Sequence, residues 1–375
     1  MPKIILTSTV PRSLDRFCRG RFVDLTSLGF DAVAVSSPGD ELDNIIMREG
    51  VRAVGVPMSR RPSPLSDIIS LVRLFRVFRK ERPDIVHSMT PKAGLLSMMA
   101  AWMAGVPVRV HTFTGLVFPT SKGILKQLLK TTDRITCSCA TNVLAEGKGV
   151  RNDLIANKIT SKHVEIIAHG NVRGIDLEFY KPSGKIREQH PFNFIYVGRL
   201  AHDKGLDELI PAFISVASRH VDCRLLLVGE DEPDDPVAKS TSETMAGNDA
   251  ITVAGFQEDI RPWMEKADCL ILPSKREGFP NVVIEAGAMG LPCIVTDVNG
   301  SNEIIVEGEN GLIVSPGDIS ALEEAMEKML TNSSMRRSMA SKAREMVARR
   351  YDRDIVWRHL SQFYIKLASE GKVSN

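Results

Sequence analysis

The strongest constraint on the fold of this chain comes from the stretch 274–290, which reads S-K-R-E-G-F-P-N-V-V-I-E-A-G-A-M-G. An apolar, strand-forming run at 269–273 precedes it, and residues 281–289 can form about two and a half helical turns. A second apolar run, 292–296, follows at once. Strand, loop, helix and strand in this order make one βαβ unit, whose loop lies at the carboxyl edge of a parallel sheet, where ligands bind.

Two carboxylates flank the start of this predicted helix. Glu277 lies in the loop and Glu285 within the helix, so the pair can address different parts of one extended ligand. Gly278 lets the backbone turn, and Pro280 fits the first helical turn, which leaves N–H groups free for phosphate or sugar oxygens. The alternative is that Glu277 only complements the helix dipole and that Glu285 is a solvated surface residue.

The run E-G-F-P-N-V-V-I-E-A resembles the paired-glutamate signature of the retaining nucleotide-sugar glycosyltransferases known as family 4 or glycosyl transferases group 1. The resemblance implies an α/β protein of the GT-B fold, with two Rossmann-like doubly wound domains that face a cleft. It implies an acceptor domain at 1–175, a linker at 176–191, a donor domain at 192–350 and a terminal helix at 351–375 that returns to the first domain.

Composition and charge agree with a two-domain enzyme. The 375 residues suffice for two domains, no apolar run approaches the roughly 18 residues that span a bilayer, and the N-terminus enters a strand without a leader, so we expect a cytoplasmic protein. The six cysteines form no C-x-x-C pair and are expected to be buried. Residues 1–180 carry 25 Lys and Arg against 16 Asp and Glu, which predicts an anionic partner for the first domain.

The first half alternates strands with helices. Strands are expected at 4–6, 32–35, 51–56, 85–86, 108–110 and 164–167, and apolar residues recur at helical spacing from Leu14 to Leu28. The first loop, T-S-T-V-P-R-S, contains no glycine. This departs from the family pattern and also removes the G-x-G-x-x-G that a dinucleotide oxidoreductase would need.

Residues 66–82 are predicted to form a basic amphipathic helix. Its cationic face consists of Arg73, Arg76, Arg79 and Lys80. Its apolar face consists of Leu71, Leu74, Phe75, Val77 and Phe78. Either the arginines are simply a solvated face, or they also attract an anionic membrane, at about 1 kcal/mol per basic residue. Further candidates for that face are Arg60, Arg61, Lys122, Lys126 and Lys130.

A second loop carries Thr90 and Lys92 in the sequence T-P-K-A-G, which resembles the family branch that builds surface glycans on polyprenyl-diphosphate carriers. The start of a helix there offers N–H donors and a compact positive charge for an acceptor diphosphate; the alternative is an ordinary helix start. His111 is expected to follow the strand 108–110, and the resemblance of H-T-F-T-G implies a contact with the transferred sugar. A histidine satisfied by a backbone partner is the alternative.

The second domain opens with a strand that ends at Gly198, followed by Arg199 and Lys204 in the family-like pattern G-R-L-x-x-x-K-G. Two cations at this point can balance a diphosphate as the sugar leaves. The remaining strands are expected at 224–229, 251–254, 269–272 and 292–296, and a polar hinge at 174–191. The donor-binding residues that the resemblance implies are Gly198, Phe256, Gly278, Phe279, Pro280, Asn281, Val282 and Glu285. For Phe256 the alternative is a buried core phenylalanine.

These features and the resemblance predict a retaining glycosyltransferase. The resemblance implies that it moves a hexosyl or N-acetylhexosaminyl group, UDP-linked in the implied branch, to a polyprenyl-diphosphate-linked glycan. By resemblance, Glu277 holds the sugar and Glu285 the ribose, while Arg199 and Lys204 replace a metal. No cofactor, metal or nucleic acid is expected, because Arg199 and Lys204 take the place of a metal in this resemblance and no two histidines have ligand-like spacing. The alternatives are a non-hydrolysing nucleotide-sugar epimerase and a non-catalytic two-domain sugar-binding protein. We expect a peripheral location on the inner face of the cytoplasmic membrane.

Overall fold

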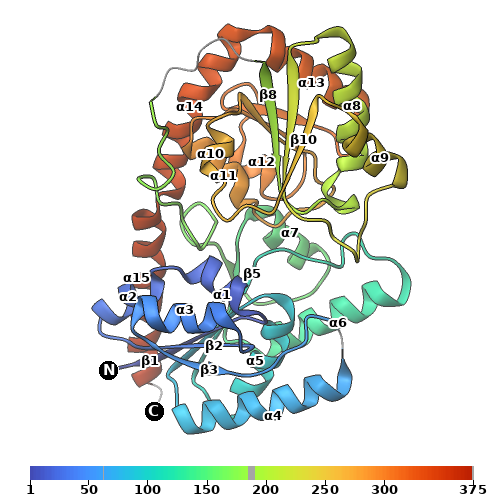
Figure 1. Ribbon diagram of the computed structural model, residues 1–375. Coiled ribbons are helices and arrows are strands. Elements are labelled where there is room, and N and C mark those ends of the chain that lie inside the picture. Colours follow the sequence, from blue (N-terminus) through green and yellow to red (C-terminus); the bar gives the residue numbers. More distant parts are fainter. Residues whose placement is uncertain (62, 185–190, 374–375) are drawn as a thin grey trace. The chain divides into compact units, whose positions relative to one another are not determined.

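The structure, a computed structural model, describes residues 1–61, 63–184 and 191–373, and these form two compact units (Figure 1). Unit 1 comprises Met1–Arg173 and Asp354–Asn375, and unit 2 comprises Gly174–Arg353. Each unit is built on one parallel sheet with helices packed against it. The two units are therefore α/β, as the alternating pattern of the sequence predicts.

The sheet of unit 1 has the strand order β3-β2-β1-β4-β5-β6-β7 among the described residues. The strands are β1 (Lys3–Thr7), β2 (Asp31–Ser36), β3 (Arg52–Gly55), β4 (Ile85–Met89), β5 (Val108–Phe113), β6 (Asn142–Ala145) and β7 (Val164–Glu165). Because the order reverses between β1 and β4, the crevice at their carboxyl ends is the topological switch point of this sheet.

Helices cover both faces of this sheet. They are α1 (Pro11–Cys18), α2 (Arg21–Ser27), α3 (Asp40–Glu49), α4 (Pro64–Glu81), α5 (Pro91–Met103), α6 (Gly123–Cys139), α7 (Lys148–Ala156) and α15 (Arg353–Val373). Successive side chains of β1 point to opposite faces, so Ile5 packs in the core under α4 to α6, and Ile4 and Leu6 pack in the core under α1, α2, α3 and α15. The helix expected from Leu14 to Leu28 is broken in two at Gly20.

The sheet of unit 2 has the order β10-β9-β8-β11-β12-β13. Its strands are β8 (Phe192–Val197), β9 (Cys223–Val228), β10 (Ile251–Gly255), β11 (Cys269–Leu272), β12 (Cys293–Thr296) and β13 (Gly311–Val314). The helical segments are η1 (His202–Lys204), α8 (Leu206–Arg219), α9 (Lys239–Gly247), α10 (Arg261–Met264), α11 (Asn281–Ala288), α12 (Ser301–Ile304), α13 (Ile319–Thr331) and α14 (Ser333–Tyr351). The switch point of this sheet lies between β8 and β11.

The chain passes between the units at two places, near Gly174 and near Arg353. The predicted linker 176–191 is described only to residue 184 and at 191, because 185–190 lie outside the described residues. Within it Tyr180 is buried in the core of unit 2, and Arg353 donates a hydrogen bond to Asp176. At the other crossing, α15 buries Leu360, Tyr364 and their apolar neighbours in the core of unit 1.

In the part of the chain that the structure describes, none of the helices has the length and apolar character needed to span a membrane.

Candidate functional site

The carboxyl edge of the unit 2 sheet brings together Lys204 and Glu277. Lys204 ends η1, just after β8, and Glu277 lies in the loop after β11, so the two residues come from opposite sides of the switch point. The Lys204 Nζ lies 2.6 Å from Glu277 Oε1, and both side chains are mostly shielded from solvent. The sequence predicts both residues near a ligand, and the structure places them in direct contact.

Arg199 lies beside this pair and is held by two carboxylates. Its Nη1 donates to Glu232 Oε2 at 2.6 Å, and its Nη2 lies 3.5 Å from Asp203 Oδ2. Burial lowers the pKa of Arg199, but the hydrogen bond to Glu232 and the charge of Asp203 outweigh it and raise that pKa above its ordinary value. Two cations and three carboxylates therefore share one edge of the sheet, an arrangement in which an anionic ligand can replace a carboxylate partner.

The loop that carries Glu277 is closely packed against the loop after β12. Gly300 has a φ of +75°, and a Cβ on it would lie 2.4 Å from the carbonyl oxygen of Gly278. No other residue fits this approach without a shift of the backbone. Gly198 directly follows β8, the first strand of unit 2. Its N–H donates to the Val228 carbonyl at 2.9 Å, which connects the loop after β8 to β9.

Helix α11 carries three of the eight predicted donor residues, Asn281, Val282 and Glu285. Pro280 is its N-cap residue, so the prediction that Pro280 lies in the first turn is wrong by one position, and Asn281 begins the helix. Glu285 is only 2 % exposed, so the alternative of a solvated surface glutamate is wrong too. Helix α11 connects the neighbouring strands β11 and β12 and packs against both of them and against α14. Phe279 and Val282 are buried, and the Phe279 ring packs edge-on against Tyr351 at 5.6 Å.

Phe256 differs from these residues because its ring is 53 % exposed. It follows β10, whose last residue, Gly255, has a φ of +67°. The alternative of a buried core phenylalanine is therefore wrong. An exposed ring at the carboxyl edge offers an apolar face for a flat ligand.

His111 lies at the carboxyl half of the unit 1 sheet. The strand expected at 108–110 extends to Phe113, so His111 is part of β5 and does not follow it. Its side chain is 1 % exposed, its Nδ1 lies 2.8 Å from Ser88 Oγ, and its ring meets Phe113 edge-on at 4.5 Å. Burial lowers the pKa of His111 to about 3, although a hydrogen bond to the Ser88 backbone opposes this, so the imidazole is neutral near pH 7.

Thr90 and Lys92, the predicted acceptor residues, already have partners in unit 1. The Thr90 hydroxyl lies 2.9 Å from Thr9 Oγ1 across the switch point between β1 and β4, and Thr9 Oγ1 also accepts the Ala93 N–H. Thr90 itself has a φ of +98°, a strained value for a β-branched residue. The Lys92 Nζ lies 2.8 Å from Asp67 Oδ1, so an acceptor diphosphate would have to compete with this carboxylate.

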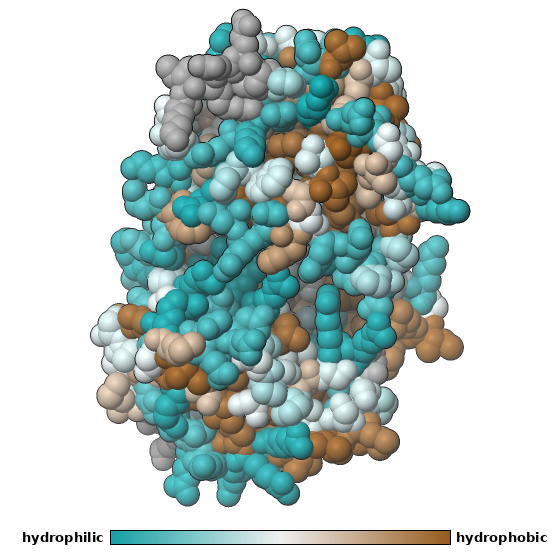
Figure 2. All heavy atoms as spheres, viewed as in Figure 1, coloured by the Kyte–Doolittle hydropathy of each residue, from teal (hydrophilic) through white to brown (hydrophobic). Residues whose placement is uncertain are grey.

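The outer surfaces of α4 and α6 carry an unexpected feature. We call the two sets of exposed aliphatic residues the aliphatic stripes: Leu65, Ile68, Ile69 and Val72 on α4, and Ile124, Leu125 and Leu128 on α6. Figure 2 shows hydrophobic side chains gathered at the lower right, over these two helices. The α4 stripe runs into the predicted cationic arc, whose four members are also exposed. The sequence prediction accounts for the arc and the buried face but not for the stripes.

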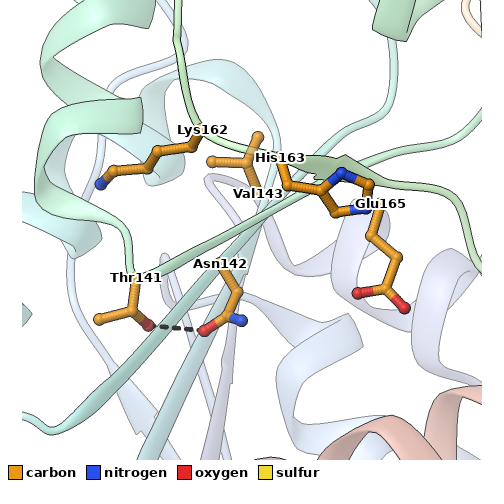
Figure 3. A pocket seen from close by; sticks show the side chains of 6 residues that line it. All are labelled: Thr141, Asn142, Val143, Lys162, His163 and Glu165. Carbon is orange, nitrogen blue, oxygen red and sulfur yellow. Dashed lines mark hydrogen bonds between the residues drawn. The ribbon is translucent and has the colours of Figure 1, made fainter.

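A small pocket opens at the other edge of the unit 1 sheet (Figure 3). It is lined by Thr141, Asn142, Val143, Lys162, His163 and Glu165, where β6 and β7 begin. The Lys162 Nζ donates to the carbonyls of Cys137 and Ser138, so this lysine caps the end of α6. None of the predicted site residues lines this pocket.

Four residues near the candidate sites escape the sequence analysis: Ser88 and Gly94 near His111, and Asp203 and Glu232 near Arg199. The acidic run E-D-E-P-D-D after β9 is a signal that could have indicated Glu232. Ser88 and Gly94 have no such signal, because their roles depend on the pairing of β4 with β5 and on the packing of α5. Among the described residues, no group of three or more His, Cys, Asp or Glu side chains is arranged to hold a metal ion.

Two doubly wound parallel sheets, one of them with basic and acidic side chains paired at its switch point, define the fold as GT-B. Solved structures agree. Anabaena Alr3699/HepE in complex with UDP aligns with a TM-score of 0.79 at 19 % identity, over 98 % of this chain and 100 % of that one. A sucrose-phosphate synthase from Thermosynechococcus elongatus aligns with a TM-score of 0.80 at 18 % identity, over 99 % of this chain and 100 % of that one.

Sequence comparisons define the family. The model for glycosyl transferases group 1 matches residues 178–346, and that for a glycosyl transferase 4-like domain matches 20–170. The capsular polysaccharide biosynthesis glycosyltransferase CapM of Staphylococcus aureus is 32 % identical over 99 % of both chains. An Escherichia coli UDP-Gal:alpha-D-GlcNAc-diphosphoundecaprenol alpha-1,3-galactosyltransferase is 28 % identical over 77 % of this chain and 80 % of its own. The chain belongs to the glycosyl transferases group 1 family and is a glycosyltransferase.

Proposed function

We propose that this enzyme transfers a hexosyl or N-acetylhexosaminyl group from a UDP-sugar to a lipid-diphosphate-linked sugar, with retention of anomeric configuration, in the synthesis of a capsular or other surface polysaccharide. The observation that carries the proposal is the Lys204–Glu277 contact at the switch point of unit 2, with Arg199 beside it. The donor is supported by the UDP-Gal named for the E. coli relative, and the acceptor by the lipid diphosphate in the same name.

In the donor site, Arg199 and Lys204 bind the diphosphate and stabilise the negative charge that grows on it as the glycosidic bond breaks. Glu277, released from Lys204, accepts hydrogen bonds from hydroxyls of the sugar. Glu285 binds the ribose, and the exposed ring of Phe256 supports the base. Gly278 and Asn281 offer backbone N–H groups at the start of α11.

Retention follows in this proposal from substitution on one face of the sugar. The bond from the anomeric carbon to the UDP oxygen breaks, and the acceptor oxygen forms its bond to the same face. The acceptor hydroxyl gives its proton to the leaving diphosphate, which becomes UDP. Arg199 and Lys204 supply the charge stabilisation that this tight ion pair requires, and His111 contacts the transferred sugar.

On the acceptor side, Lys92 and Thr90 are the proposed contacts for the lipid diphosphate. Lys92 is paired with Asp67, so acceptor binding exchanges one oxyanion for another at the same ammonium. Both residues belong to the loop at the switch point of unit 1, the position at which a doubly wound sheet binds ligands.

A lipid-linked acceptor requires the enzyme to work at a membrane, and we place it peripherally on the inner face of the cytoplasmic membrane. The aliphatic stripes of α4 and α6 support this location, since exposed aliphatic rows flanked by cations fit an anionic bilayer surface. Arg73 and Arg76 continue the α4 stripe and would meet lipid phosphates while the aliphatic side chains enter the acyl boundary.

A nucleotide panel tests the donor site. UDP and UDP-sugars should raise the midpoint of thermal unfolding of the purified protein, because a ligand that binds only the folded state stabilises it. The shift should disappear in Lys204→Ala. Stabilisation by GDP- or ADP-sugars instead would contradict the UDP assignment, and no shift with any nucleotide would favour the sugar-binding alternative.

A further inference from the structure

The imidazole of His111 is fixed by three neighbours from unit 1. Ser88 Oγ lies 2.8 Å from Nδ1, the Phe113 ring packs edge-on at 4.5 Å, and the backbone of α5 at Gly94 lies against the ring. Ser88 and His111 are opposite each other on the paired strands β4 and β5, which sets this contact. No hydrogen bond joins Nε2 to any residue that the structure describes.

The Ser88 hydroxyl has one hydrogen-bond partner among the described residues, His111 Nδ1, and its side chain is fully buried. If Nδ1 carried the proton, the hydroxyl hydrogen would have no acceptor. A buried donor without a partner costs about 1–3 kcal/mol. If Nδ1 is unprotonated, the hydroxyl donates to its lone pair, and the proton is on Nε2, which is not among the fully buried described atoms that lack a partner.

We propose that Ser88 donates a hydrogen bond to Nδ1 of His111 and so holds the imidazole in the tautomer that has its proton on Nε2. Ser88 is then a positioning residue, and His111 presents a neutral N–H donor at Nε2. In that form Nε2 has no lone pair with which to accept a proton from the acceptor hydroxyl. His111 therefore acts as a hydrogen-bond donor to an oxygen of the transferred sugar and not as a general base.

The structure also indicates what removal of Ser88 Oγ would do. A backbone hydrogen bond to Ser88 also acts on the imidazole and favours its protonated form, but it does not select a tautomer. Without the hydroxyl, Nδ1 loses the side-chain donor that keeps its lone pair engaged. Ser88→Ala should therefore remove the preference for the Nε2-protonated tautomer while the ring keeps its place between Gly94 and Phe113.

The direct test is ¹⁵N NMR of the histidine-labelled full chain, in which protonated and unprotonated ring nitrogens have separate shifts. The protein has eight histidines, and the His111 signals are assigned by their loss in His111→Phe. We expect a protonated Nε2 in the wild type and a measurable fraction of the Nδ1-protonated tautomer in Ser88→Ala. A wild-type His111 with its proton on Nδ1 would overturn the proposal.

The role in catalysis rests on the proposed function and has its own test. Ser88→Ala should lower kcat about tenfold and leave the Kd for UDP unchanged. The control is Ser97→Ala, which removes another fully buried hydroxyl of unit 1, bonded to Thr7 Oγ1 at 3.0 Å, and should retain activity.

A double variant tests whether Ser88 acts through His111. In a His111→Phe background, Ser88→Ala should cause no further loss of kcat. An equal loss there would show that Ser88 acts through the fold alone. An inactive wild type with the expected tautomer would contradict the proposed function, not the tautomer.

Discussion

A Cβ placed on Gly94 would lie 2.3 Å from Cε1 of His111, so the imidazole occupies the space that any side chain at position 94 would need. Gly94 lies inside α5, where glycine costs up to about 1 kcal/mol relative to alanine. The position of His111 is therefore maintained at the expense of the intrinsic stability of α5. The contact joins the strand that carries His111 to the helix that begins with the predicted acceptor loop.

Gly94→Ala should displace the His111 ring and lower kcat/KM by at least about tenfold, because small displacements of reacting groups are costly. Overpacking should also destabilise unit 1 by about 1–3 kcal/mol. Gly247→Ala, at the end of α9 with no atom within 4 Å of the added Cβ, is the matched control and should keep full activity. Equal activity of the two variants would contradict the contact.

Substitutions of Lys204 and of Glu277 should change the affinity for UDP in opposite directions. Lys204→Ala removes a charge-assisted contact worth about 1.5–3 kcal/mol, so its Kd for UDP should rise roughly 10- to 100-fold. Glu277→Gln removes the carboxylate that competes with the diphosphate, so UDP should bind as well or better while transfer is lost. Isothermal titration calorimetry measures both. Weaker UDP binding in Glu277→Gln would show that the glutamate supports Lys204 instead of competing for it.

Glu146, at the carboxyl end of β6, predicts a pH dependence of stability. Its side chain is 2 % exposed, and Oε1 has no hydrogen-bond partner among the residues that the structure describes. Burial raises the pKa to about 8 against the opposing effects of the Val172 N–H and the Arg173 charge, so the folded protein keeps a proton that the unfolded chain loses above about 4.5. The contribution of Glu146 to the free energy of unfolding therefore decreases as the pH rises from about 4.5 to about 8.

Glu146→Gln should remove that contribution. Relative to the wild type, the variant should gain at most about 1.4 kcal/mol of stability per pH unit between pH 5 and pH 8, and little below pH 4.5. Thermal melts of both proteins at pH 5, 6.5 and 8 measure the difference. A variant whose advantage over the wild type does not grow with pH would show that Glu146 is already ionised in the folded state.

The aliphatic stripes predict two separable components of lipid binding. Arg73→Gln with Arg76→Gln should weaken binding to phosphatidylglycerol vesicles roughly 30-fold, since each cation contributes about 1 kcal/mol. Ile68→Ser with Leu125→Ser should weaken it too, and the binding that remains should disappear in high salt. Val221→Ser, an exposed valine of unit 2, is the control. If the stripe variants alter the oligomeric state and leave vesicle binding unchanged, the stripes bind a second copy of the chain.

Much of the fold could be predicted from the sequence because both sheets are parallel and buried. The apolar runs that become β1, β2, β8 and β11 are conspicuous for this reason. The strands that the analysis missed, β6 and β13, are only four residues each, and short apolar runs of that kind occur in helices as well. The break at Gly20 was missed because the apolar spacing continues across it.

The residues of the candidate site that could be predicted are charged residues placed just after a predicted strand. Arg199, Lys204 and Glu277 follow strands, and the carboxyl ends of parallel strands meet at one edge. The ion pairs were less predictable. The acidic run after β9 could have indicated Glu232 but not that it pairs with Arg199, and Asp67 reaches Lys92 through helix packing that leaves no periodic signal. Positions such as Ser88 become informative only once strand register is known.

The central claim is tested most directly by a transfer assay with a lipid-diphosphate-linked N-acetylglucosamine acceptor and a panel of UDP-hexoses and UDP-N-acetylhexosamines. The account predicts release of UDP that depends on the acceptor, together with an extended lipid-linked product in which NMR finds the anomeric configuration of the donor. A product of inverted configuration would contradict the retaining mechanism. An altered free nucleotide sugar formed without any acceptor would contradict the transferase itself.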